Sequence, residues 1–129
     1  MSLSTDDITQ ILQLYSRYNT AIDTGDGEGF GGCFVPEGVF DSGMGANNGR
    51  EAIAAFAEST HKNLPDMRHL AKNIVVDGDG DEATGSAFLI GYRTAGGFQV
   101  IVTGRYRDTL KRTGDGWRFV ERIFQADGA

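Results

Sequence analysis

A chain of 129 residues with 40% hydrophobic and 23% charged residues can bury one hydrophobic core but is short for two domains. We therefore expect a single domain over residues 1–129 that is neither disordered nor fibrous. The formal net charge of −6 disfavours nucleic acid and anionic membranes as partners, because both bind through clustered Lys and Arg.

The start of the chain and its single cysteine indicate a reducing compartment. No apolar run approaches the ~20 residues that span a bilayer, and Ser2 to Asp7 lacks the charged-then-apolar layout of a signal peptide. Cys33 has no internal disulfide partner, and no histidine near it in sequence would activate its thiol. We expect a cytoplasmic protein in which Cys33 is a small buried hydrophobic residue.

The N-terminal third of the chain reads as helix. Ser4 and Asp7 resemble a capping box, and they precede apolar residues at helical spacing, so the pattern predicts a long amphipathic helix over residues 5–24. Gly25 is a plausible terminator, and Asp26 could cap a short second helix leading toward Phe34.

The middle of the chain combines a short strand, a loop and a third helix. Residues 39–41 read as a short strand, and the glycine-containing stretch 43–49 reads as a flexible loop beside a cleft. Ala52, Ile53, Phe56 and Ala57 recur at helical intervals, which predicts a helix over residues 50–61.

From residue 67 onward, β-branched and aromatic residues alternate with glycine-rich turns, the pattern of consecutive antiparallel strands. Short turns make successive strands neighbours in the sheet. Helices followed by a strand meander indicate an α+β fold. The predicted strands cover residues 67–77, 82–94, 97–112 and 116–125.

Polar residues interrupt the apolar face of the first helix. Tyr15, Asn19 and Asp23 are spaced by four residues and form one slowly drifting row. This row could place a carboxylate near the helix end that packs on the sheet. The alternative is that Asn19 bonds a strand backbone and Asp23 faces water.

In the first long strand, strict alternation puts His69, Ala71, Asn73 and Val75 on one face. A histidine titrates near neutrality, and a carboxylate beside it could orient the ring and stabilise its charged form. Asp23 and His69 could therefore act as a general acid–base pair. The alternative is an ordinary hydrogen-bonded core histidine.

The remaining strands supply aromatic residues that could either line a pocket or fill it. Charged residues alternate with them, and we expect most of these charges to lie on a solvated face or in cross-strand pairs. They include Arg105, Asp108, Glu121 and Arg122. The spacing of His and Cys matches no zinc site, and no phosphate-binding loop or nucleophile elbow is present, so we expect neither a metal nor a cofactor.

Six short motifs together resemble the SnoaL-like domain of the nuclear transport factor 2-like (NTF2-like) superfamily, the group that includes scytalone dehydratase. They occur in order between about residues 6 and 123. The motifs are Tyr18-x4-Asp23, Gly49-Arg50-Glu51-Ala52-Ile53, Arg68-His69-x3-Asn73, Asp77-Gly78-Asp79, Gly104-Arg105-Tyr106-Arg107-Asp108 and Gly116-Trp117-Arg118.

The resemblance implies a cystatin-like cone, in which a bent antiparallel sheet packs on N-terminal helices and encloses one pocket. It also implies homodimers or homotrimers. Asp23 and His69 match the catalytic carboxylate and one catalytic histidine of scytalone dehydratase, and Tyr18 matches a pocket aromatic. The chain departs from that enzyme at the second histidine, where Ala87 or its neighbours stand, and at the pocket amide near Tyr106.

We therefore hypothesise a cofactor-independent lyase, such as a dehydratase, or an isomerase that acts on a small apolar, aromatic or polycyclic carbonyl compound. Asp23 and His69 would be catalytic. The substrate-binding candidates are Tyr15, Tyr18, Asn19, Asn73 and Tyr106. Two alternatives remain: a non-catalytic small-molecule binding protein, or an association subunit like the small subunit of ring-hydroxylating dioxygenases.

Overall fold

The long first helix begins and ends where its capping residues predict. A computed structural model describes residues 2–128, and helix α1 covers Thr5–Thr24. Ser4 Oγ accepts a hydrogen bond from the Asp7 backbone N–H at 3.0 Å, and Asp7 Oδ2 accepts one from the Ser4 N–H at 3.1 Å. Gly25 ends the helix in the left-handed conformation at φ 76°, which glycine adopts without strain. The predicted helix over 5–24 is confirmed.

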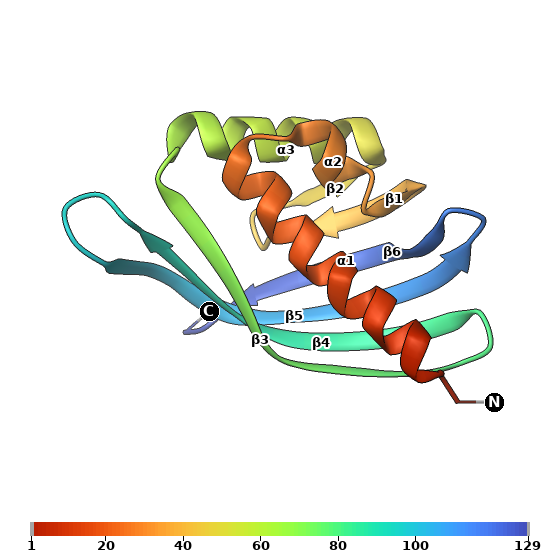
Figure 1. Cartoon of the computed structure of the whole chain (residues 1–129). Coiled ribbons are helices and arrows are strands. Elements are labelled where there is room, and N and C mark those ends of the chain that lie inside the picture. Colours follow the sequence, from red (N-terminus) through yellow and green to blue (C-terminus); the bar gives the residue numbers. More distant parts are fainter. Residues whose placement is uncertain (1, 129) are drawn as a thin grey trace.

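Two further helices lie together at one end of the molecule (Figure 1). Helix α2 covers Gly27–Gly31, and Asp26 Oδ1 caps it by accepting a hydrogen bond from Gly29 N–H at 2.8 Å. Helix α3 covers Arg50–Asn63, two residues longer than predicted, and buries Ile53 and Ala57. Within the described residues, no helix is long and apolar enough to cross a membrane.

One curved, open sheet of six strands lies against α1, which crosses its concave face diagonally (Figure 1). The strand order is β2-β1-β6-β5-β4-β3. The last four strands form the predicted antiparallel meander. The bounds are β1 Phe34–Asp41, β2 Ala46–Asn48, β3 Met67–Asp79, β4 Glu82–Arg93, β5 Gln99–Thr113 and β6 Gly116–Ala126.

Two predictions about the sheet are wrong. The sheet is mixed rather than antiparallel throughout, because β1 pairs with β6 in parallel. The stretch 43–49, predicted as a loop, contains strand β2, whose Asn48 pairs with Val39 of β1. Three residues are too few for a periodic pattern, so β2 exists because β1 provides a free edge with which it can pair.

A bulge in β3 reverses the predicted facing of the residues that follow it. Lys72 pairs with Phe88 and Val75 with Ser86, so β3 holds one residue more than β4 between these pairs. Asn73 accommodates the extra residue at φ 53°, a backbone conformation that asparagine tolerates better than most residues. Ile74 therefore packs against the core while Asn73 is exposed. The prediction that Asn73 shares a face with His69 is wrong.

Aromatic rings fill much of the space between α1 and the sheet. The Tyr18 ring centroid lies 4.4 Å from that of Phe30 and 6.0 Å from that of Tyr106. Phe34 and Phe119 are fully buried in the same cluster. Such contacts contribute about 0.5–1.5 kcal/mol per pair beyond the area they bury. This part of the cone is therefore a packed aromatic core.

Candidate functional site

Asp23 and His69 form a hydrogen-bonded pair between the end of α1 and the start of β3. The Asp23 Oδ1 to His69 Nδ1 distance is 2.6 Å, and Asp23 Oδ2 accepts a hydrogen bond from the His69 backbone N–H at 3.0 Å. The predicted contact is therefore present. One carboxylate fixes both the strand and the ring of the same residue.

The position of β3 in the sheet explains this second hydrogen bond. Because β3 is an edge strand, every other backbone N–H points away from β4 and needs a different acceptor. Asp23 satisfies the N–H of His69 and at the same time blocks the edge. The pair consequently has a structural role even without any chemistry.

The Asp23–His69 pair is almost, but not fully, enclosed. The side chain of His69 is 9% exposed and that of Asp23 is 15% exposed. Because Asp23 occupies Nδ1, the remaining ring nitrogen, Nε2, is the one that can exchange a proton with a bound molecule.

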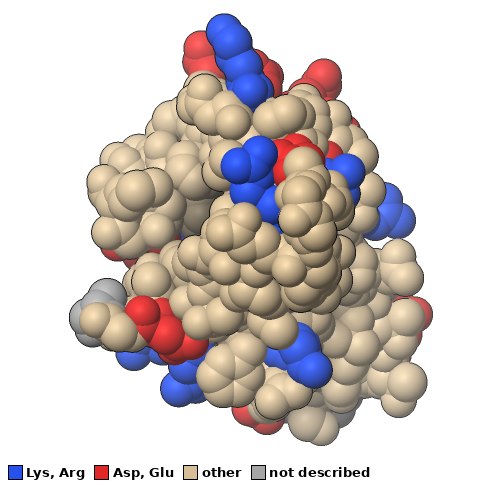
Figure 2. Space-filling view, turned by 90° about the vertical axis from the view of Figure 1, so that its left-hand side faces the viewer, with Lys and Arg blue, Asp and Glu red and all other residues tan. Residues whose placement is uncertain are grey.

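The end of the molecule where β4 and β5 form a hairpin presents mainly uncharged residues, with small groups of charged side chains around them (Figure 2).

A second buried ion pair, which the sequence analysis missed, joins β5 to β6. Arg122 Nε donates to Asp108 Oδ1 at 2.9 Å, and both side chains are 0% exposed. The hydroxyl group of Tyr15, in α1, donates a hydrogen bond to Asp108 Oδ2. Asp108 and Arg122 form a cross-strand pair, one of the two arrangements expected for these charges, but the pair is buried rather than solvated.

A bulge in β6 accounts for the burial of Arg122. Thr109 pairs with Glu121 and Leu110 with Phe119, so Val120 is an extra residue that shifts the phase of the strand. Phe119 and Arg122 both face inward although they are three residues apart. The sequence contained a sign of this bulge, because Trp117 and Phe119 stand at odd-numbered positions of the chain and Phe124 stands at an even-numbered one.

Four rings surround the Arg122 guanidinium. Its Cζ lies 3.5 Å from the ring centroid of Tyr106 and 4.3 Å from that of Tyr18. Tyr15 and Phe119 lie at 4.8 and 4.7 Å. The electron-rich ring faces attract the cation, most strongly where water is excluded.

The buried hydroxyls of this cluster stay protonated. Burial raises the pKa of Tyr18 and of Tyr106, and the Tyr18 hydroxyl donates a hydrogen bond to Tyr106. The negative charges of Asp108 and Asp23 add to the rise in the pKa of Tyr106, while Arg122 opposes it. Burial likewise raises the pKa of Asp108, against the opposing effect of Arg122.

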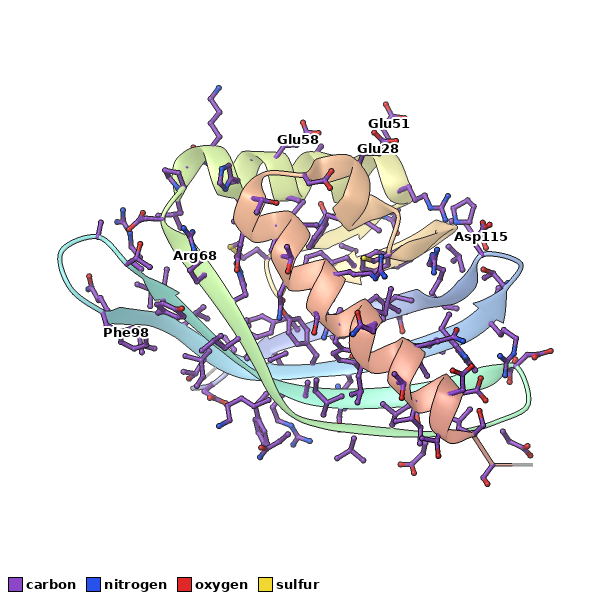
Figure 3. The ribbon with its side chains drawn as sticks, in the orientation of Figure 1. Glu28, Glu51, Glu58, Arg68, Phe98 and Asp115 are labelled. Carbon is purple, nitrogen blue, oxygen red and sulfur yellow. The ribbon has the colours of Figure 1, made fainter. Side chains whose placement is uncertain are left out.

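The predicted substrate-binding residues have different locations. Tyr18 and Tyr106 lie in the core beside Arg122, and Tyr15 bonds Asp108. Asn19 lies partly buried between them and Asp23, and its Oδ1 has no hydrogen-bond partner. Only Asn73 lies away from the others. Phe98, in the turn between β4 and β5, extends away from α1 (Figure 3).

Hollows on the described surface lie elsewhere. One of about 790 Å³ separates α1 from the β5–β6 turn, and one of about 810 Å³ separates α2 from α3. A third, of about 480 Å³, borders Val120. Neither Asp23 nor His69 lines any of the three. Among residues 2–128, no group of three or more His, Cys, Asp or Glu side chains is placed to hold a metal ion.

Comparisons with known proteins agree with this architecture. A family model described as the SnoaL-like domain matches residues 4–123. An uncharacterized protein of Mycobacterium tuberculosis is 30% identical over 122 residues, which cover 91% of this chain and 83% of the relative.

Two solved structures from Novosphingobium aromaticivorans have the same fold. An NTF2-like protein with a cystatin-like fold is 32% identical with a TM-score of 0.90, covering 96% of this chain and 84% of its own. A protein described as a proposed aromatic ring hydroxylase is 28% identical with a TM-score of 0.84, covering 98% and 93%. The chain therefore belongs to the SnoaL-like domain family and has the cystatin-like fold of NTF2-like proteins.

Proposed function

We propose that this protein is a cofactor-independent lyase or isomerase that moves a proton on a small apolar or aromatic carbonyl compound. The observation that carries the proposal is the Asp23–His69 pair, with its 2.6 Å contact and its nearly enclosed side chains. A carboxylate on Nδ1 fixes the imidazole and stabilises its charged form, which is the arrangement of a general base.

In the proposed reaction, His69 Nε2 removes a proton from the carbon next to the carbonyl group. Asp23 balances the imidazolium that forms. An isomerase would return the proton to another carbon, and a dehydratase would give it to a departing hydroxyl group as water leaves. Tyr106 remains protonated and accepts a hydrogen bond from Tyr18, so the Tyr106 hydroxyl can donate to the carbonyl oxygen as negative charge develops on it.

The aromatic content of the interior supports an apolar ligand. Rings of Tyr18, Phe30 and Tyr106 pack together in the interior, and flat apolar molecules make favourable contacts with such rings. One structural relative is described as a proposed aromatic ring hydroxylase, which is consistent with an aromatic ligand although that chemistry differs.

Hydrogen–deuterium exchange tests this proposal without knowledge of the natural substrate. We expect the protein to speed exchange of the α protons of 1-indanone or 1-tetralone in deuterium oxide, followed by proton NMR. His69→Gln should lower the rate about 100-fold, the usual contribution of a general base, and Asp23→Asn should lower it as well. Lys72→Ala, on the exposed side of the same strand, is the control. Exchange no faster than in buffer, or equal in wild type and His69→Gln, would contradict the proposal.

We also propose that copies of the chain pair through the outer face of the sheet, as an NTF2-like association domain would. Large apolar side chains on this face are 40–45% exposed at Leu70, Phe88 and Ile101. Sedimentation should give a dimer or trimer that Ile101→Asp converts to monomer. Met44→Asp, at an equally apolar but distant exposed position, should leave assembly unchanged. A wild-type monomer at high micromolar concentration would refute the pairing.

A further inference from the structure

A hollow of about 790 Å³ lies between α1 and the β5–β6 turn, apart from the Asp23–His69 pair. Its volume falls within the roughly 300–1,000 Å³ that small-molecule sites occupy. Leu14, Cys33 and Trp117 line it and are buried, so their side chains give the hollow an apolar floor. The hollow has the size and the floor of a ligand site, and the groups on its rim decide which ligand fits.

One guanidinium on the rim is held in place and has no counter-ion. Arg118 Nη1 donates a hydrogen bond to the Trp117 backbone oxygen at 2.8 Å, which holds the side chain against the start of β6. Among residues 2–128, Arg118 forms no ion pair with a carboxylate. Its Nε and Nη2 groups make no hydrogen bond to any described residue. A guanidinium with free N–H groups is a strong partner for a carboxylate.

An amide acceptor faces the same space as this guanidinium. A Cβ on Gly116 would lie 3.5 Å from Arg118 Nη1 and 3.8 Å from Gln10 Oε1, so the two atoms flank one point beside Gly116. Gln10 Nε2 donates to Asp6 Oδ2 at 3.0 Å, which leaves Oε1 as the free end of the amide. Gly116 has φ 104°, a conformation that disfavours other residues, so the space between the two groups stays open.

Together Arg118 and Gln10 specify a ligand that offers the opposite pair of groups. A carboxylate accepts hydrogen bonds from Arg118, and a neighbouring N–H donates one to Gln10 Oε1. An acylated amino acid has both groups on one carbon, its carboxylate and its amide N–H. A simple carboxylic acid lacks the N–H, and a free amino acid brings an ammonium charge next to the guanidinium.

The charges around the hollow favour a ligand with a single negative charge. Arg17 also lines it, as do Asp26 and Asp115, the latter in the β5–β6 turn (Figure 3). With Arg118 these are two positive and two negative side chains, so the lining has no net charge. A phosphate dianion would gain little attraction from such surroundings, whereas one carboxylate needs only the cation that it contacts.

We propose that this hollow binds an N-acyl amino acid with an apolar acyl group. Its carboxylate accepts from Arg118, its amide N–H donates to Gln10 Oε1, and its acyl group lies over the floor of Leu14, Cys33 and Trp117. The C-terminal end of a peptide has the same two groups, but the apolar floor offers no partners for its further backbone amides. The hollow shares no residue with the Asp23–His69 pair, so this binding function adds to the proposed reaction and does not depend on it.

Binding of three related probes tests each contact separately. Hippurate, which is N-benzoylglycine, carries the carboxylate and the amide N–H. Its methyl ester lacks the charge, and benzoyloxyacetate has an ester oxygen in place of the N–H. Dissociation constants come from NMR titration followed at the indole N–H of Trp117, the only tryptophan in the chain. Hippurate should bind about tenfold tighter than the methyl ester and about fivefold tighter than benzoyloxyacetate, because hydrogen bonds to charged groups are the stronger ones.

Two variants with side chains of similar length assign the contacts. Arg118→Met should reduce the tenfold ratio to about one and preserve the fivefold ratio, and Gln10→Met should do the reverse. The ratio that persists in each variant shows that the hollow is intact. Arg107→Met, at an exposed position of β5, is the control and should leave both ratios unchanged.

Four results would overturn the inference. They are the absence of saturable hippurate binding up to about 10 mM, ratios that persist in both variants, tighter binding of pyrophosphate than of hippurate, and tighter binding of a tetrapeptide ending in glycine. The third result would assign the hollow to phosphates, and the fourth to peptide ends. Because no turnover is measured, these outcomes are independent of the hydrogen–deuterium exchange at His69.

Discussion

The two carboxylate pairs in the interior of this protein differ in their exposure to solvent. The Asp23–His69 pair joins a helix to an edge strand and keeps 15% and 9% of its side-chain surface exposed. The Asp108–Arg122 pair joins two neighbouring strands, has no exposed surface and is surrounded by rings. Only the first can exchange protons with an incoming molecule. The second supplies a fixed charge distribution, because a sealed ion pair can neither hydrate nor rearrange cheaply.

Removing one member of the sealed pair should have the largest effect on stability. We expect Asp108→Asn to lower the free energy of unfolding by about 3–5 kcal/mol, because Arg122 cannot lose its proton and becomes an uncompensated buried cation. Arg122→Met should cost less. Burial already raises the pKa of Asp108, so the carboxyl group left behind can take up a proton. Urea unfolding of the single variants measures this asymmetry.

The double variant Asp108→Asn/Arg122→Met completes the test. It removes both charges and should be more stable than Asp108→Asn alone, with a coupling that a double-mutant cycle reads directly. Equal losses for the two single variants, or strictly additive losses in the double variant, would mean that the pair is not sealed as described.

The two pairs also show which parts of the site could be predicted from the sequence. The α1 row and alternation over the first residues of β3 placed Asp23 and His69 on faces that meet, because both patterns are regular there, and the family resemblance strengthened the prediction. Alternation failed after Lys72 and again after Phe119, where one extra residue shifts the phase of each strand. Bulges depend on the pairing of two strands, which a single-strand pattern does not contain. Asn73 was therefore predicted on the same face as His69, and the burial of Arg122 was not predicted.

The Asp23–His69 pair should matter less for stability than the sealed pair. Asp23→Asn keeps an oxygen near the ring and the His69 backbone N–H, and water can reach the side chains through the small exposed area. We expect a loss of about 1.5–3 kcal/mol in the free energy of unfolding, the range of one hydrogen bond to a charged group. Chemical denaturation at pH 7 measures it. A loss as large as that of Asp108→Asn would show that the pair is a core element rather than an accessible one.

The smallest effect belongs to a partly exposed ion pair that serves as a reference for both buried pairs. Asp66 binds Arg93 through two carboxylate oxygens, with an Nη2 to Oδ1 distance of 2.7 Å, and it also accepts the Ala95 N–H. Hydrogen bonds from Arg93, followed by that from Ala95, lower the pKa of Asp66 to about 2.

The lowered pKa of Asp66 sets the sign of the pH dependence. In the unfolded chain Asp66 has its ordinary pKa of 3.8, so the stabilisation that its ion pair gives the folded state is complete above pH 3.8 and disappears as the pH falls through about 2. The stability difference between wild type and Asp66→Asn should therefore be constant from pH 5 to 7 and shrink below pH 3.8.

For Asp108 the raised pKa reverses the sign, because the folded state binds the proton more readily than the unfolded one. Wild type should then gain stability relative to Asp108→Asn as the pH falls toward 3.8. Urea unfolding across this range would contradict the contrast between the partly exposed Asp66 and the sealed Asp108 if both stability differences moved in the same direction.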